Sequence, residues 1–145
     1  MGVRLGPGDT GSVWGKFNPS TVHAPAGYSH VTIANAERVV YFAGQVPLDR
    51  DGNLVGASGD VEAQTDQVIA NCLAVLEAAG TRPEDVVRAV VYVVSSDSAV
   101  LAAVWDRLMA SELAPAFSAA STLLGVAALG YRGQLVEIDL TATLP

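Results

Sequence analysis

Residues 135–143, near the C-terminal end of the chain, alternate strictly between two kinds of side chain. The first set is wholly apolar and consists of Val136, Ile138, Leu140 and Ala142. The second set is mixed and consists of Leu135, Glu137, Asp139 and Thr141. Because successive side chains of a strand point to opposite faces of a sheet, this pattern predicts a strand with one covered face. Glu137 is then placed on the opposite face.

The rest of the chain predicts further strands and two helices around this segment. Strands are expected at residues 27–34, 38–48, 85–94 and 121–127, with a short strand after the Asp51-Gly52 turn. Helices are expected at 60–80 and at 98–112; Asp60 is the N-cap of the first and Gly80 its end. Two helices can cover only one face of such a sheet, so Glu137 lies on the face without helices.

Residues 1–17 are rich in Gly and have no hydrophobic period, which predicts a flexible N-terminal extension. Residues 18–145 are then expected to form a single domain, since the chain of 145 residues is long enough for one core.

The shortage of charge favours contact with another subunit. Charged residues make up 16% of the chain and hydrophobic residues 50%, against roughly 25% charged residues in an ordinary soluble domain. So little polar material predicts apolar area that is hidden in an oligomer. The alternative is that abundant Ala and Gly inflate the apolar fraction.

The sequence also argues against several partners and sites. A net charge of −7 without a basic cluster argues against nucleic acid, and therefore against a ribonuclease. No apolar run approaches the ~18 residues of a membrane span. Two histidines and one cysteine, without the usual ligand spacing, predict no metal site, and no motif indicates a cofactor. Cys72 allows no internal disulfide, which makes a reducing cytoplasm the expected location.

The first strand separates its side chains by face as well. Tyr28, His30 and Thr32 share one face, which mixes aromatic and polar groups. The β-branched run at 85–94 is typical of a strand buried on both faces. Tyr28, His30 and Glu137 are therefore candidates to line a cleft between subunits, where pockets often form.

Four segments occur together in an order and spacing typical of one family. They are VYFAGQVPLDRDGNLV, QTDQVIANCLAVLEAAG, DVVRAVVYV and LVEIDLTA. The chain resembles the RidA (YjgF) family of reactive-intermediate deaminases, also described as endoribonuclease L-PSP-like, over residues 18–144. The resemblance implies an α+β, chorismate-mutase-like fold: a mixed six-stranded sheet with two helices on one face, assembled as a homotrimer with clefts between subunits.

The resemblance also implies roles for individual residues. Tyr28 matches a tyrosine that lines the cleft, and Glu137 matches the glutamate that orients the attacking water. Gly44 and Gln45 match a strand end whose backbone contributes to the site. Leu123 stands where some members place a cysteine. Ser121 falls where the family carries the arginine that binds a substrate carboxylate.

These implied roles predict a small-molecule site with an unusual substrate. Imine hydrolysis needs a held substrate, one positioned water and a group that relays a proton, and Glu137 suits the last task. Without the arginine, weak or absent activity on 2-aminoacrylate-type substrates is expected. Arg132 is considered as a compensating group, although its glycine-flanked position favours an exposed turn.

The sequence leaves the roles of three residues open. Glu137 is either an acid/base or a structural partner for a neighbouring subunit. His30 is either a second proton carrier or an interface group. Phe117 is a candidate to cap the cleft. The chain is therefore either an imine or enamine deaminase-type hydrolase, or a trimeric protein that binds a small molecule or acts as a chaperone without catalysis.

Overall fold

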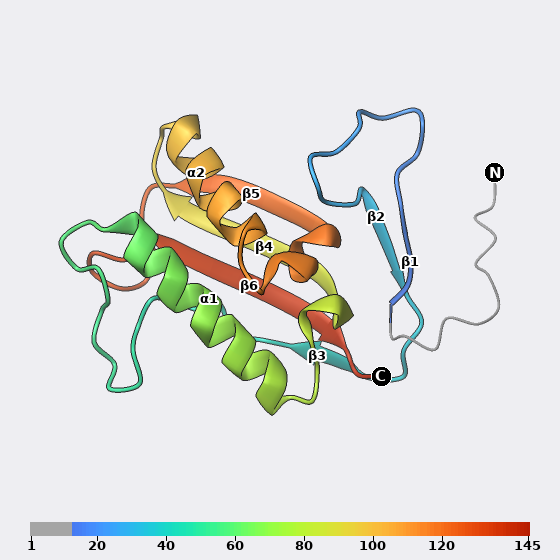
Figure 1. Cartoon of the computed structure of the whole chain (residues 1–145), viewed down its shortest axis with the longest axis horizontal. Helices are drawn as coiled ribbons and strands as arrows, with labels where there is room; N and C mark the ends of the chain where they lie inside the picture. The colour runs from blue at the N-terminus through green and yellow to red at the C-terminus, as the bar shows by residue number, and fades with distance from the viewer. Residues whose placement is uncertain (1–12) are drawn as a thin grey trace.

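The computed structural model of the chain describes residues 13–145 (Figure 1). The described strands are β1 (Val13–Phe17), β2 (Val31–Ala34), β3 (Val39–Tyr41), β4 (Val86–Val94), β5 (Ala120–Val126) and β6 (Val136–Thr143). The α-helices are α1 (Val61–Ala78) and α2 (Ser98–Met109). Short 3-10 turns precede β4 (η1, Pro83–Asp85) and β5 (η2, Ala114–Ser118).

In the described part of the chain, the strands divide into a four-stranded sheet and a separate pair. The sheet is mixed and has the order β3-β6-β4-β5. β4 and β5 run parallel, whereas β6 is antiparallel to both β3 and β4. β5 is therefore an edge strand that leaves one side available to other segments.

The prediction of a single six-stranded sheet is wrong, because β1 and β2 pair only with each other. β2 meets the start of β5 without a regular ladder. The backbone N–H of Ser29 donates to Ala119 O (3.3 Å), and that of Ala120 donates to the hydroxyl of Thr32 (2.9 Å). The short strand expected after the Asp51-Gly52 turn is reduced to one bridge, between Leu48 and Leu54.

β1 lies within the segment for which the sequence predicts flexibility. Residues 13–17 pair antiparallel with β2, from Val13 opposite Ala34 to Phe17 opposite Val31. For these residues the prediction of a flexible extension is wrong. A strand without hydrophobic period forms here because β2 supplies the partner backbone. The remainder of that extension lies outside the described residues.

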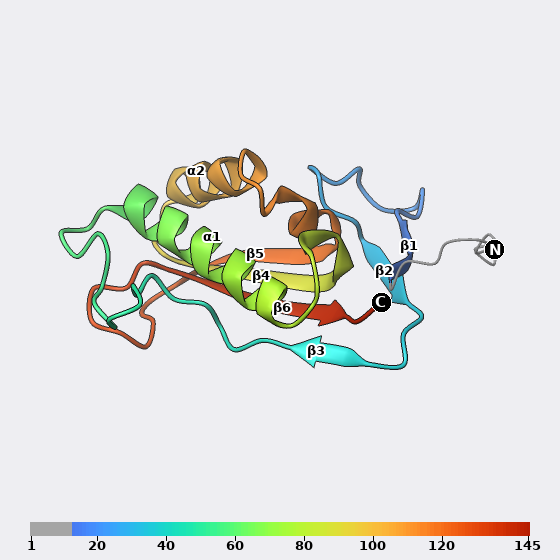
Figure 2. The ribbon, with the colours of Figure 1, turned by 60° about the horizontal axis from the view of Figure 1, so that its bottom comes forward.

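α1 and α2 lie on the same face of the sheet, as Figure 2 shows. The apolar set of β6 is buried beneath them: Val136, Ile138 and Ala142 are 0% exposed and Leu140 1%. α1 begins where the Asp60 carboxylate accepts the N–H of Ala63 (3.0 Å), and it ends before Gly80, whose φ is +74°. The predicted faces and caps are confirmed.

The opposite face of the sheet is not covered within residues 13–145. In β4, Ala89, Val91 and Val93 are fully buried on the helix side. Val90 and Tyr92, on the other side, are only half-buried. The prediction that β4 is buried on both faces does not hold in a single chain, because no layer covers the second face there. None of the helices described in residues 13–145 is long and apolar enough to cross a bilayer.

Candidate functional site

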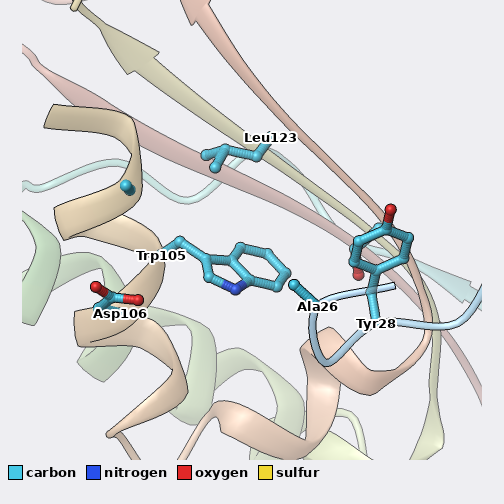
Figure 3. Close-up of a pocket in the computed structure, with 7 residues that line it drawn as sticks. Ala26, Tyr28, Trp105, Asp106 and Leu123 are labelled. Atoms are coloured by element: carbon cyan, nitrogen blue, oxygen red, sulfur yellow. The ribbon is translucent and has the colours of Figure 1, made fainter. Parts of the chain in front are cut away.

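A pocket of about 370 Å³ lies between the edge strand β5, helix α2 and the loop that precedes β2 (Figure 3). Its walls are formed by Ala26, Tyr28, Ala102, Trp105, Asp106, Ser121 and Leu123. Tyr28, Ser121 and Leu123 are site residues that the sequence predicted, and the fold brings them together. Trp105 and Asp106 are additions from α2.

The register of β5 explains why Ser121 and Leu123 reach this pocket. Ser121 pairs with Ala89 and Leu123 with Val91 in the parallel ladder. Both partners are buried beneath the helices, and paired residues of neighbouring strands point to the same face. Ser121 and Leu123 therefore point to the helix side of the sheet, where α2 forms the facing wall.

Trp105 is held in place by a residue beneath it. Its ring meets that of Phe117 in an edge-to-face arrangement, with 5.6 Å between centroids, a favourable geometry for aromatic pairs. Phe117 is 0% exposed. The prediction that Phe117 caps the cleft is therefore wrong: the 3-10 turn η2 directs its side chain into the core, where it supports a pocket wall instead.

The hydroxyl of Ser121 points towards backbone carbonyls of the residues just before it. Its oxygen lies 3.0 Å from Ala119 O and 3.2 Å from Phe117 O. A hydroxyl has one proton, so one of these carbonyls takes it and the oxygen keeps its lone pairs for another donor. Ser121 consequently offers an acceptor to the pocket.

The strand predicted for residues 27–34 is confirmed only from Val31 onward, and Tyr28 and His30 lie in the loop that precedes it. Their side chains are nevertheless neighbours, and His23 joins them. The Tyr28 hydroxyl lies 2.8 Å from Nε2 of His23, and Nε2 of His30 lies 2.8 Å from the backbone oxygen of His23. The rings of Tyr28 and His30 are edge-to-face at 5.6 Å. The hydrogen bond from His30 thus fixes the loop that carries His23, and the His23 ring in turn fixes the position of the Tyr28 hydroxyl. These contacts of His23 depend on the loop conformation, so no local sequence pattern predicts them.

Glu137, Gly44 and Gln45 form a second group. Gln45 is bound to β6 in both directions, through N–H to Ile138 O (2.7 Å) and through O from Ile138 N–H (3.1 Å). The Glu137 carboxylate lies over Gly44, so a Cβ at that position would overlap its Oε2 atom. The buried amide of Gln134 donates to Glu137 Oε1 (3.1 Å). These contacts fix the position of the carboxylate.

The two groups do not meet within one chain. Ser121 pairs with Ala89, which pairs with Leu140 of β6, three residues beyond Glu137. Two strand spacings and three residues separate Ser121 from Glu137 by about 14 Å across the sheet. They also point to opposite faces. The acid that the resemblance implies is therefore absent from the pocket of the same chain.

The remaining candidate groups lie elsewhere. Arg132 is exposed in the loop between β5 and β6, as expected. Arg88 lies on the helix-free face and donates to Thr122 Oγ1 (2.7 Å). Cys72 is buried in the core, where burial raises the pKa of its thiol to about 12. Among residues 13–145, no group of three His, Cys, Asp or Glu side chains could hold a metal ion.

The sequence missed Trp105 as a pocket residue and did not single out Asp106. The helical pattern places Trp105 on the core stripe of α2, and its ring does pack on the core through Phe117. Asp106 is the next residue along the helix, but it is exposed and lies away from that stripe. Helical periodicity could have placed Trp105 near the sheet, whereas only the position of β5 and of the loop before β2 shows that Asp106 lines a pocket at this edge.

The chain is similar to known proteins over most of its length. The sequence model of the family described as "Endoribonuclease L-PSP" matches residues 19–144. A RutC family protein of Synechocystis is 37% identical over 123 residues, which are 84% of this chain and 90% of that protein. A crystal structure of the Rid family protein YyfB from Yersinia pestis, itself described as of unknown function, has a TM-score of 0.80 at 41% identity and covers 89% of this chain and 97% of that one. RidA from Psychrobacter has a TM-score of 0.61 at 27% identity, with 92% and 98% covered.

Proposed function

This chain belongs to the RidA/RutC family described as Endoribonuclease L-PSP, and on that basis we propose that it hydrolyses a small imine, or the imine form of an enamine, in clefts between copies of the chain. The observation that carries the proposal is the separation of two ordered groups. One contains Tyr28 and Ser121 beside a pocket, and the other contains Glu137 over Gly44. A site that needs both takes one from each of two copies.

The helix-free face supports association of copies. Half-buried apolar side chains of β4 and β5 lie on it, namely Val90, Tyr92, Val94, Leu124 and Val126. Tyr41 of β3 is 80% exposed and Val39 46%. Such apolar area favours a subunit interface over contact with water. We propose a homotrimer, the assembly that the family resemblance implies, in the cytoplasm that the single cysteine favours.

The reaction is an addition of water followed by loss of ammonia. A protonated imine R₂C=NH₂⁺ takes up H₂O, with Glu137 orienting the water and accepting one of its protons as the C–O bond forms. Glu137 then returns that proton to the carbinolamine nitrogen, and the C–N bond breaks as the hydroxyl group gives up its own proton and becomes the carbonyl. The released NH₃ takes up this hydroxyl proton, so the products are R₂C=O and NH₄⁺. A carboxylate within hydrogen-bond reach can perform these proton transfers.

Ser121 sets a limit on the substrate. At the position where the resemblance implies an arginine, a hydroxyl cannot form a bidentate pair with a substrate carboxylate. One such charge-assisted bond is worth about 1.5–3 kcal/mol, which is on the order of tenfold to a hundredfold in affinity. We expect carboxylate-bearing imines such as 2-aminoacrylate derivatives to be poor substrates, and Ser121→Arg to improve them.

Assemblies that contain two different variant chains test whether the site is shared between copies. Tyr28→Phe and Glu137→Gln are each expected to abolish or strongly reduce imine hydrolysis, measured as ammonia release in competition with semicarbazide trapping. Co-expression of the two variants should restore activity, because random assembly gives about one quarter of the clefts both native groups. No restoration, in assemblies shown by mass spectrometry to be mixed, would contradict a site shared between copies. A mass in solution of 14.9 kDa, that of the monomer, would contradict the assembly itself.

A second function is favoured by the pocket itself. Because its lining lacks Glu137, a single chain can bind a ligand without the proposed acid/base. The chain would then be a small-molecule-binding protein without catalysis. Saturable binding with no product, unchanged in Glu137→Gln, would distinguish this function from hydrolysis.

A further inference from the structure

We propose that the pocket beside β5 selects a cationic ligand, a small primary ammonium or iminium with an apolar substituent and no carboxylate. This inference rests on the proposed function insofar as it names the substrate class of that site. The first observation is the charge of the lining. Asp106 is the one charged side chain among the seven lining residues, and none of them is basic.

The charge of Asp106 is not neutralised within the described part of the chain. Its neighbour Arg107 is directed to α1, where it binds both carboxylate oxygens of Asp66 (2.7 Å each) and lies 3.6 Å from Glu62. Lys16 donates to Ser118 Oγ (2.7 Å), which does not line the pocket. No hydrogen bond or ion pair of the Asp106 side chain occurs among residues 13–145. Within residues 13–145, the Asp106 carboxylate is therefore available to a ligand cation.

The polar atom opposite reinforces this preference. Ser121 gives its proton to a backbone carbonyl, since Ala119 O and Phe117 O lie within 3.2 Å of its oxygen. While that proton stays hydrogen-bonded to a carbonyl, the Ser121 oxygen accepts hydrogen bonds from the pocket. An ammonium or iminium N–H matches such an acceptor, whereas a carboxylate oxygen would meet lone pairs at Ser121 and a negative charge at Asp106.

The aromatic walls accept a cation as well. Figure 3 shows the Trp105 ring projecting from α2 towards Ala26, with Tyr28 beyond it. The faces of Trp and Tyr rings attract ammonium groups. Leu123, Ala26 and Ala102 supply apolar contact for a hydrocarbon substituent. The volume of about 370 Å³ suits a ligand with a single ring or a short branched chain.

The same charge favours the reactive form of an imine. A carboxylate beside an imine nitrogen stabilises the protonated, electrophilic form over the neutral one. In the assembled cleft, Glu137 of a second copy adds a further negative charge. The pocket would thus hold the species that water attacks, using the positive charge of the imine in place of a substrate carboxylate.

A series of three probes of similar shape tests the selection: benzylamine, benzyl alcohol and benzoate, which are cationic, neutral and anionic at neutral pH. Titration calorimetry at low salt is expected to rank their affinities in that order. Asp106→Asn should weaken benzylamine by up to about fivefold, the upper end of the range for an exposed ion pair, and leave benzyl alcohol unchanged. Asp51→Asn, in the turn before α1, is the matched control because it removes the same charge away from the pocket.

Equal or tighter binding of benzoate, absence of benzylamine binding, or an equal effect of Asp51→Asn would overturn the inference. A hydrolysis assay on an imine made from a carboxylate-free amine distinguishes failure of the cation pocket from failure of the proposed hydrolase. Ammonium selectivity by calorimetry without any imine hydrolysis would support the cation pocket and refute the hydrolase. Hydrolysis restricted to carboxylate-bearing imines, without ammonium selectivity, would support the hydrolase and refute the cation pocket.

Discussion

Replacement of Gln64 by methionine tests how the fold positions the start of β6. Gln64 lies on α1 and is 0% exposed. Its amide nitrogen donates to Gly56 O (3.1 Å) and Gly133 O (2.9 Å), and its Oε1 accepts the N–H of Leu135 (2.7 Å). One side chain therefore joins α1 to two loops and to the residue before β6.

The expected cost follows from these bonds. Gln64→Met keeps the volume and the helix propensity but removes three hydrogen bonds, each worth about 1 kcal/mol net. The loss of unfolding free energy is then about 3 kcal/mol, or about 6–12 °C in Tm for a chain of this size. Gln67→Met is the matched control on the same helix. It removes one bond, to Asn71 Oδ1 (3.0 Å), and should cost about 1 kcal/mol.

Thermal and urea unfolding followed by circular dichroism measure both variants. All samples need the same protein concentration, since association would make Tm concentration-dependent. Hydrogen exchange gives a local check, because the Leu135 amide should lose protection in Gln64→Met and keep it in Gln67→Met. If Gln64→Met is no more destabilising than Gln67→Met, the assignment of a structural role to the buried amide is refuted.

Three further predictions concern the core and the surface. A Cβ at Gly125 would overlap a backbone carbonyl of the β4–α2 connection, so Gly125→Ala should lower the free energy of unfolding by about 1–3 kcal/mol. Gly130→Ala is the control, because nothing lies within 4 Å of a Cβ there, and it should leave Tm unchanged in thermal unfolding. The thiol of Cys72, with its pKa raised to about 12 by burial, should react with Ellman's reagent only on unfolding, and rapid labelling of the folded protein would contradict its place in the core. The hydrogen bond from Arg107 lowers the pKa of Asp66 in the folded state. Its stabilisation is therefore present above the unfolded pKa of about 3.9 and lost as pH falls through the folded value. The difference in Tm between wild type and Asp66→Asn should shrink as the pH is lowered from about 6 to about 2, and a constant difference would count against the pair.

The sequence determined much of the architecture because the relevant signals are local. The alternation in residues 135–143 assigned each side chain of β6 to the correct face. Asp60 and Gly80 marked the ends of α1, since a cap side chain and a residue with positive φ are local requirements. The order and spacing of four sequence segments carried the resemblance to the family that the comparisons show. β1 was missed because its strand state depends on β2 and not on its own pattern.

Only the tertiary structure decided which candidate residues share a site. The resemblance implied clefts between subunits that contain Tyr28, Ser121 and Glu137, but it did not show which subunit supplies each residue. Strand register places the first two beside α2 and Glu137 on the opposite face of the same chain. Register depends on pairing between residues far apart in the chain, so no local pattern encodes it. The fold also turned Phe117 into the core and brought Trp105 and Asp106 to the open edge of β5. The physical reason is that a side chain's direction follows from its element, whereas its neighbours follow from how the elements pack.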